Sequence, residues 1–400
     1  MLNNVRRSGL VISLAGFAIS VNTLPALVSW FSARLGVPIA SFGLIFLLQF
    51  ASYTLCSITV GKLHATRKLP LLGIVIGSLA LSSFFLFWIG SIKSFAMLVL
   101  IMILVGGAGG LIESIGTTLI TSSSGSNRML YTSQFFYCLG AFLAPLGVGL
   151  LLSLDVSLPV IGYMVGLFSL FIGSIVTLLV YQPWRSNREE VVDQSPAEAE
   201  VVLTKREAGE VNLLAFAFLF MTMVSYVILE SSVANWFAVY VHDVLKQTSA
   251  NASFTLSLYW MGMGLSRLFF LIIRIKNHPK TLLIHIGMMV VATLALNLPV
   301  AKSSGIAPFL AIFLLGVGCG PIWPLLVEYC SIIFAREHLL MYLVGAGSIG
   351  ALSGPVITAS LFSLFGLQRM MALFLAYLVV IFLAAIVTIA MTARHRTKLV

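Results

Sequence analysis

The sequence predicts an all-α integral membrane protein in which twelve transmembrane helices form two pseudo-symmetric six-helix bundles. Three observations support this fold class. First, 60% of the 400 residues are hydrophobic and 9% are charged, whereas a soluble domain has about 25% charged residues. Second, the apolar residues fall into twelve long segments. Third, motifs in the first half of the chain recur in the second half at one constant spacing.

The twelve apolar segments are each long enough to cross a bilayer, which takes about 20 residues. Within lipid every backbone group must be hydrogen-bonded inside the protein, so we expect helices. The first segment follows two arginines but is too long for the apolar region of a cleaved signal peptide, so we expect it to be retained. The predicted spans are 8–31, 39–60, 69–90, 95–121, 129–152, 158–181, 212–240, 252–275, 281–301, 305–335, 339–366 and 370–392.

One long hydrophilic stretch separates the first six spans from the last six. Its charged and polar composition is typical of a linker between domains. The sequence therefore predicts an N-terminal six-helix bundle at residues 1–181, a cytoplasmic linker at 182–211 and a C-terminal six-helix bundle at 212–400.

The basic residues are distributed unevenly between the two ends of the spans. Of the 23 lysines and arginines, 17 lie on the side that holds both termini, 5 lie on the other side, and Arg267 lies within a span. Lysine and arginine are enriched in cytoplasmic loops. We therefore expect a multi-pass protein of the plasma or inner membrane with both termini in the cytoplasm. The net charge of +10 then reflects topology, and no nucleic-acid partner is expected.

An internal repeat with an offset of 210 residues links the two halves. Repeats of this kind place substrate sites near the bilayer midplane, between the two bundles. At this offset residues 139–145 (LGAFLAP) align with 349–355 (IGALSGP), Gly106 and Gly110 align with Gly316 and Gly320, and 48–50 (LQF) aligns with 258–260 (LYW).

The chain resembles the major facilitator superfamily. The resemblance rests on the six-plus-six arrangement and on the GA-x-x-x-P signatures within 139–145 and 349–355. The segments 230–236 (ESSVANW), 260–267 (WMGMGLSR) and 109–113 (GGLIE) are similar to the fucose-permease-like branch, which contains sugar–proton symporters. The resemblance implies transport of small solutes by alternating access, often with a proton, and a monomeric protein. It also implies a role in proton coupling for the acid in the fourth span, here Glu113.

Four charged side chains lie well inside the predicted spans, namely Glu113, Glu230, Glu328 and Arg267. Each costs about 2.5–3.5 kcal/mol to insert, and a low dielectric favours the neutral form of a carboxyl group. We therefore predict that Glu113 and Glu230 carry a proton or contact the substrate. Arg267 and Glu328 fall at similar depths, so we expect them to form a structural ion pair, with a gating role as the alternative.

Polar and aromatic side chains within the spans are candidates for the wall of a solute cavity. Buried amides in lipid need a hydrogen-bond partner, and aromatic faces can stack on a sugar, although aromatic residues are also common lipid-facing anchors. The candidate cavity residues are Asn22, Gln49, Tyr226, Asn235, Trp236, Tyr259 and Trp323.

The leading functional hypothesis is a secondary transporter for a small polar solute, such as a sugar, coupled to protons, with sodium as the alternative ion. Export of a lipophilic or drug-like compound by proton antiport is the second hypothesis. A membrane enzyme or a sensor is a remote third, because the sequence has no HExxH, GxSxG or Walker A motif. The four cysteines lack the spacing of a zinc site, so we expect no metal and no cofactor.

Overall fold

The computed structural model describes residues 4–67, 69–124, 127–181, 212–273, 275–298, 306–334 and 336–396. These residues form helices joined by short connections, with no β-strand among them. Twelve helical segments of the described chain are long and apolar enough to cross a membrane. The predicted all-α class and the number of spans are confirmed. The predicted linker at 182–211 lies outside the described residues, so the domain boundaries stay a prediction.

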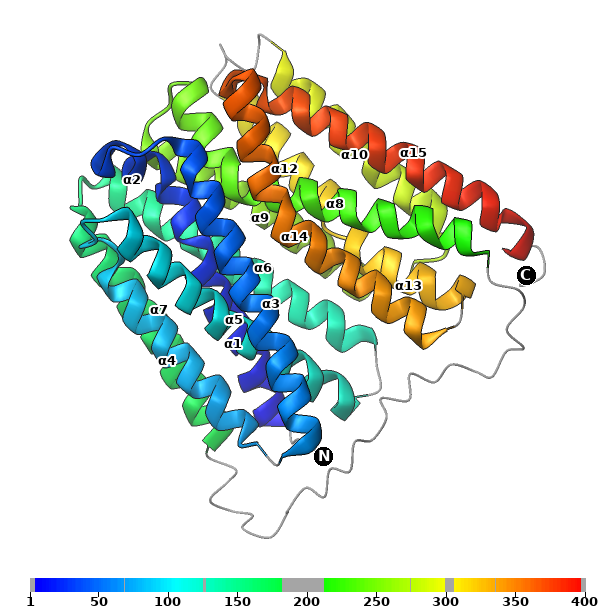
Figure 1. The fold of residues 1–400 in the computed structure, drawn as a ribbon, viewed down its shortest axis with the longest axis horizontal. Coiled ribbons are helices and arrows are strands. Elements are labelled where there is room, and N and C mark those ends of the chain that lie inside the picture. The colour runs from blue at the N-terminus through cyan, green and yellow to red at the C-terminus, as the bar shows by residue number, and fades with distance from the viewer. Residues whose placement is uncertain are drawn as a thin grey trace.

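The helices follow the chain in two groups (Figure 1). The first group contains α1 (Asn4–Asn22), η1 (Leu24–Leu27), α2 (Val28–Leu35), η2 (Ile39–Ser41), α3 (Phe42–Thr66), α4 (Leu71–Ile89), α5 (Phe95–Ser124), α6 (Asn127–Ser153) and α7 (Leu158–Tyr181). The second contains α8 (Leu213–Val239), the π-helical turn η4 (Tyr240–Val244), α9 (Ser249–Ile272), α10 (His278–Asn297), α12 (Ala307–Cys319), α13 (Ile322–Phe334), α14 (Glu337–Phe365), η5 (Leu367–Arg369) and α15 (Met370–Arg396).

Local sequence explains where several helices begin and break. Asn212, Thr248 and Asn277 each accept a hydrogen bond from a backbone N–H three residues later, at 3.0–3.2 Å, which satisfies a donor that the first helical turn leaves free. Proline has no N–H donor, so the first span changes to a 3-10 turn around Pro25 and the tenth span breaks at Pro321. These breaks divide both spans into two helices.

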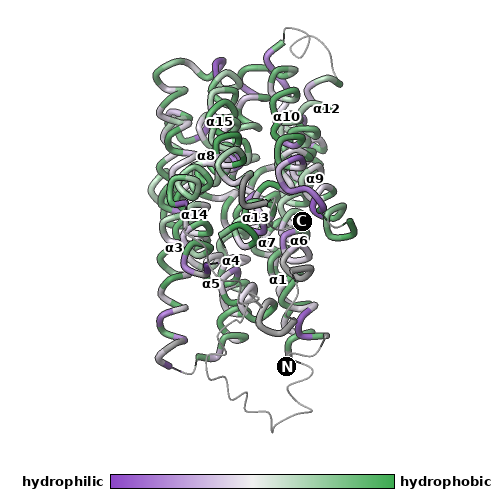
Figure 2. The backbone as a smooth tube through the Cα atoms, turned by 90° about the vertical axis from the view of Figure 1, so that its right-hand side faces the viewer, coloured by the Kyte–Doolittle hydropathy of each residue, from purple (hydrophilic) through white to green (hydrophobic). Residues whose placement is uncertain are grey.

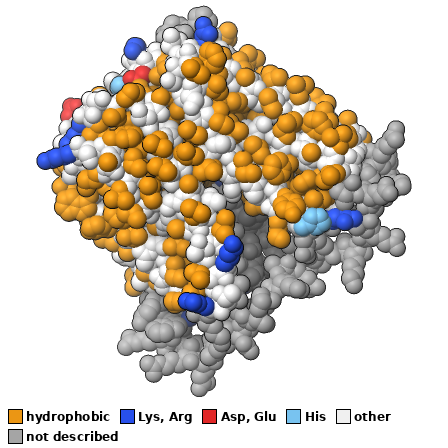
Figure 3. Space-filling model, in the orientation of Figure 1, with side chains coloured by type: hydrophobic (Ala, Val, Ile, Leu, Met, Phe, Trp, Pro, Cys, Tyr) orange, Lys and Arg blue, Asp and Glu red, His pale blue; other side chains and the backbone are white. Residues whose placement is uncertain are grey.

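The surface is that of a protein surrounded by lipid. Hydrophobic side chains cover most of the face shown in Figure 3, and the lysines and arginines visible there lie toward its edges. The hydrophobic colouring in Figure 2 runs along the length of the helices. Large apolar residues such as Leu55, Phe84 and Ile272 are more than half exposed. Apolar patches this extensive are rare on soluble monomers.

The two groups of helices converge at one end and diverge toward the end where both termini lie (Figure 1). We call the end with the termini the terminal face and the other end the far face. Between the groups, α6 packs along α9 and α3 packs along α14.

Side chains of the two groups close the far face. Ser29 on α2 donates a hydrogen bond of 2.6 Å to the Asp243 carboxylate on η4. Phe46 on α3 stacks edge-on against Trp236 on α8, with 5.3 Å between ring centroids. Polar and aromatic contacts therefore join the two groups at this end.

The internal repeat is visible in helix packing. Gly106 on α5 packs directly against the backbone of Gln49 on α3, and Gly316 on α12 packs directly against the backbone of Tyr259 on α9. Both the glycines and their contact partners are 210 residues apart. A Cβ atom at either glycine would collide with backbone, so both positions require glycine for close helix approach. Equivalent helix pairs in the two groups thus use equivalent residues.

Candidate functional site

A cavity of about 400 Å³ lies between the two groups of helices. Its wall comes from α1, α3, α5 and α6 on one side and from α8, α9, α13 and α14 on the other. Thr117, Thr118 and Val344 line the part that extends toward the terminal face. The volume falls within the roughly 300–1,000 Å³ of small-molecule sites. The site predicted between two bundles therefore corresponds to a real cavity.

Equivalent positions of the repeat face this cavity, but their chemistry differs. The first group contributes an acid, an amide, a valine and aromatic rings at positions where the second contributes two tryptophans, small residues and valines. The cavity-lining pairs with the offset of 210 are Phe17 and Val227, Val21 and Ser231, Phe50 and Trp260, Glu113 and Trp323, Gln134 and Val344, and Tyr137 and Gly347.

Glu230 and Arg267 form an ion pair in the wall of the cavity. Arg267 Nη2 lies 3.3 Å from Glu230 Oε1, and the two side chains are 3% and 16% exposed. The same guanidinium donates to the backbone carbonyl of Gly320 at 3.0 Å and to Gln134 Oε1 at 3.1 Å. Gln134 belongs to the first group and the other three residues to the second. Arg267 therefore connects the two halves within the cavity.

The prediction of an ion pair between Arg267 and Glu328 is wrong. Glu328 lies on α13 outside the cavity, and its carboxylate is 3.3 Å from His278 Nε2 at the start of α10. The expected equal depth is the error: Arg267 donates to the Gly320 carbonyl, and Glu328 lies eight residues further along the same span, about 12 Å at 1.5 Å per residue. Arg267 faces α8 and α6 rather than the side of α13 that carries Glu328.

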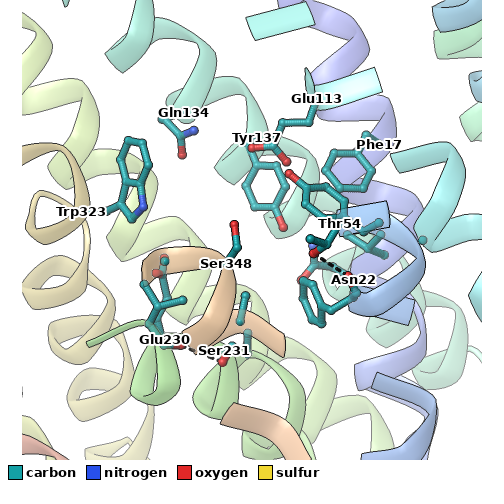
Figure 4. A pocket seen from close by; sticks show the side chains of 18 of the residues that line it. Phe17, Asn22, Thr54, Glu113, Gln134, Tyr137, Glu230, Ser231, Trp323 and Ser348 are labelled. Atoms are coloured by element: carbon teal, nitrogen blue, oxygen red, sulfur yellow. Dashed lines mark hydrogen bonds between the residues drawn. The ribbon is translucent and has the colours of Figure 1, made fainter. Parts of the chain in front are cut away.

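Glu113 occupies the opposite wall. Its carboxyl group lies beside the hydroxyl of Tyr53 and near Tyr137, and no described basic side chain pairs with it within 4 Å. Figure 4 shows Glu113, Tyr137 and Phe17 grouped together, with Glu230 across the cavity. Glu113 and Glu230 both line the cavity, as the sequence predicted, and their roles in coupling stay predictions.

The three candidate amides also line the cavity. Asn22 and Asn235 each donate a hydrogen bond to a backbone carbonyl four residues earlier, of Ala18 at 2.9 Å and of Ser231 at 2.7 Å. Gln49 is 3% exposed, and its Oε1 atom has no hydrogen-bond partner. An unpartnered buried acceptor is costly unless a ligand or water supplies a donor. Among the three amides, Gln49 therefore gives the strongest indication of a bound ligand.

Three of the four aromatic candidates do not line the cavity. The Tyr226 hydroxyl donates to the Cys319 carbonyl at 2.8 Å, Trp236 Nε1 donates to the Pro355 carbonyl at 2.9 Å, and the Tyr259 hydroxyl lies 3.5 Å from a carbonyl on α8. The rings of Tyr226 and Tyr259 are completely buried between helices of the second group, and Trp236 is completely buried between that group and Phe46 of α3. In each of the three the polar atom lies against a backbone carbonyl. Trp323, the fourth candidate, lines the cavity.

Several cavity residues lie outside the candidate set taken from the sequence. They include Phe17, Phe50, Tyr53 and Ser348. Phe50 precedes Trp260 by the repeat offset, so the repeat itself contained a signal for this pair. For Tyr53 the equivalent residue does not line the cavity, and its place beside Glu113 depends on how α3 packs against α5.

Comparison with known families identifies the chain. The family described as the Major Facilitator Superfamily matches residues 8–343. The chain belongs to the major facilitator superfamily. It is therefore a multi-pass membrane transporter and not an enzyme. No curated protein sequence matches this superfamily member.

Solved structures share its fold over nearly the whole chain. A bacterial homolog of the human lysosomal transporter Spinster, in an inward-facing and unoccupied conformation, has a TM-score of 0.73 at 14% identity and covers 98% of this chain and 99% of its own. The nucleoside transporter NupG has a TM-score of 0.68 at 15% identity, and the match covers 96% of this chain and 99% of NupG. The human organic anion transporter MFSD10 (TETRAN) has a TM-score of 0.61 at 17% sequence identity, and the match covers 95% of this chain and 98% of MFSD10. At these identities the likeness establishes the fold alone.

Proposed function

We propose that this superfamily member is a secondary active transporter that moves a small polar solute, such as a sugar or a related metabolite, by alternating access. One observation carries the proposal, namely a cavity with amide, hydroxyl and aromatic walls between two bundles that are joined at one face and apart at the other. Polar groups on both walls suit a solute that forms hydrogen bonds with each bundle.

The terminal face is assigned to the cytoplasm in this proposal. The support is the distribution of basic residues, 17 on that side against 5 on the other. The structure then represents an inward-facing state of a monomer in the cell membrane. The similar fold of the Spinster homolog, which is described as inward-facing, agrees with this assignment.

Protons are the coupling ion in this proposal, with sodium as the alternative. Glu113 and Glu230 are the acids that line the cavity, so each could load and release a proton as the open face changes. The fucose-permease-like resemblance of the segments around Glu113, Glu230 and Arg267 favours the same mechanism and stays a prediction.

Uptake into proteoliposomes under an imposed pH gradient tests the proposal. We expect accumulation of the solute that collapses when the gradient is removed and that fails in Glu113→Gln or Glu230→Gln. Glu328→Gln is the matched control, because Glu328 lies in a span but outside the cavity. Gradient-independent uptake that is unchanged in both cavity variants would contradict proton coupling.

Export of a drug-like compound by proton antiport is the second candidate. The observation that favours it is the aromatic part of the wall, which includes Phe17, Phe50, Tyr137, Trp260 and Trp323. A resistance phenotype on expression, without accumulation of any polar solute, would favour export.

A further inference from the structure

The charges that line the cavity do not balance. Three described residues of the lining are charged, and two of them, Glu230 and Arg267, pair with each other at 3.3 Å. With Glu113 ionised, these three side chains carry a net charge of −1. An uncompensated charge in a low-dielectric site is costly. A proton or a cationic group must therefore neutralise Glu113.

Aromatic rings form a connected cluster that includes Tyr53 and Tyr137, the neighbours of the unbalanced acid. The ring of Phe17 lies 6.0 Å from Tyr53 and 5.7 Å from Tyr137, measured between centroids. Phe50 lies 6.4 Å from Tyr53, and Trp260 lies 5.9 Å from Tyr137. All five rings line the cavity, and Figure 4 shows Phe17 and Tyr137 beside Glu113. Aromatic rings attract ammonium groups, and most strongly where water is excluded.

Among the described residues that line the cavity, two buried side-chain polar atoms have no hydrogen-bond partner, one an acceptor and the other a donor. Gln49 Oε1 is an acceptor on α3, one turn from Tyr53, and Trp260 Nε1 is a donor on α9. Both side chains line the cavity and are 3% and 4% exposed. The first suits an N–H donor, and the second suits an oxygen acceptor.

We propose that the transported solute carries a positively charged ammonium group, and that this group binds between Glu113, Gln49 and the surrounding aromatic rings. The inference rests on the proposed function and narrows its substrate class to amine-bearing polar solutes, such as amino sugars and amino alcohols. The ammonium group neutralises the Glu113 carboxylate, and where it carries N–H groups, as in an amino sugar, it also donates to Gln49 Oε1. A hydroxyl oxygen of the same solute accepts from Trp260 Nε1, so the solute contacts both bundles.

Binding of two matched probe pairs to the purified full-length protein tests this assignment. D-Glucosamine differs from D-glucose by one amine, and choline differs from 3,3-dimethyl-1-butanol by its charge. By calorimetric titration we expect the cationic member of each pair to bind at least tenfold more tightly, which corresponds to about 1.4 kcal/mol. Equal affinities within both pairs would overturn the inference. This comparison uses the unmodified protein and so does not depend on the folding of any variant.

Variants of the acid locate the subsite. In Glu113→Gln the affinity ratio within each pair is expected to fall to about one, whereas Glu113→Asp and the control Glu328→Gln keep a preference for the cation. A preference that survives in Glu113→Gln would overturn the assignment. Gradient-driven uptake of D-glucose without any preference for D-glucosamine would overturn the inference and leave the proposed function standing. Failure of all four probes to bind would overturn the inference and leave standing the proposed function, which names no single solute.

Discussion

Replacement of Glu230 by glutamine is expected to destabilise the protein by about 3–5 kcal/mol, because it leaves the buried Arg267 without its counter-charge. A guanidinium stays charged at any accessible pH. At the observed separation of 3.3 Å and an effective dielectric constant of about 20, the lost attraction is about 5 kcal/mol. Removal of one partner of a buried ion pair typically costs about 3–5 kcal/mol.

A double-mutant cycle isolates this pair. The single variants Glu230→Gln and Arg267→Gln and their combination are compared by unfolding of the detergent-solubilised protein. We expect the double variant to be at least about 1.5 kcal/mol more stable than the sum of the single effects predicts, because it leaves no unpaired charge. Glu328→Gln is the control and should cost less than about 1 kcal/mol, since that side chain is 27% exposed.

The cycle can also refute the reasoning. If the effects of Glu230→Gln and Arg267→Gln add to within about 0.5 kcal/mol, the two side chains do not interact energetically. The ion pair would then be absent from the dominant conformation of the protein, and the connection that Arg267 makes between the two bundles would lose its support.

Three further predictions concern other contacts. Ser29→Ala removes a hydrogen bond to the Asp243 carboxylate, worth about 1.5–3 kcal/mol, so spin-label distances across the far face should reveal a roughly 10- to 150-fold larger open population; an unchanged distance distribution would contradict this. Gly106→Ala should lower the thermal midpoint, because its Cβ would collide with the backbone of α3, whereas Gly77→Ala, which meets nothing within 4 Å, should raise it slightly. Tyr226→Phe should cost about 1 kcal/mol of stability, because it removes the hydrogen bond to the Cys319 carbonyl; an unchanged midpoint of thermal unfolding would contradict this.

The residues that line the cavity show how well the internal repeat predicts the site. Glu113 and Trp323 are 210 residues apart, and both line the cavity as predicted. Phe50 and Trp260 are another such pair, and the repeat is sufficient to find Phe50 from Trp260. The relation is partial: equivalent helices contribute to both walls, but Gln49 lines the cavity and its equivalent Tyr259 does not.

The aromatic candidates show where prediction from the sequence fails. Tyr226 lies one helical turn from Glu230 and so shares its side of α8, yet its ring is enclosed by α12 and bonds the Cys319 carbonyl. Because the Tyr226 ring reaches the neighbouring helix α12, contacts with that helix determine where the ring lies. Spacing along α8 does not contain this information.

The sequence alone determined that this protein is all-α, that it crosses the membrane twelve times and that its halves are related, because hydropathy and repeat spacing belong to each segment regardless of its neighbours. Tertiary structure decided which charges meet. Arg267 lies level with Gly320, and Glu328 is eight residues further along that span, about 12 Å at 1.5 Å per residue; hydropathy does not give this register between helices. Arg267 therefore pairs with Glu230 and not with Glu328, and only the packing of α9 against α8 and α6 fixes that choice.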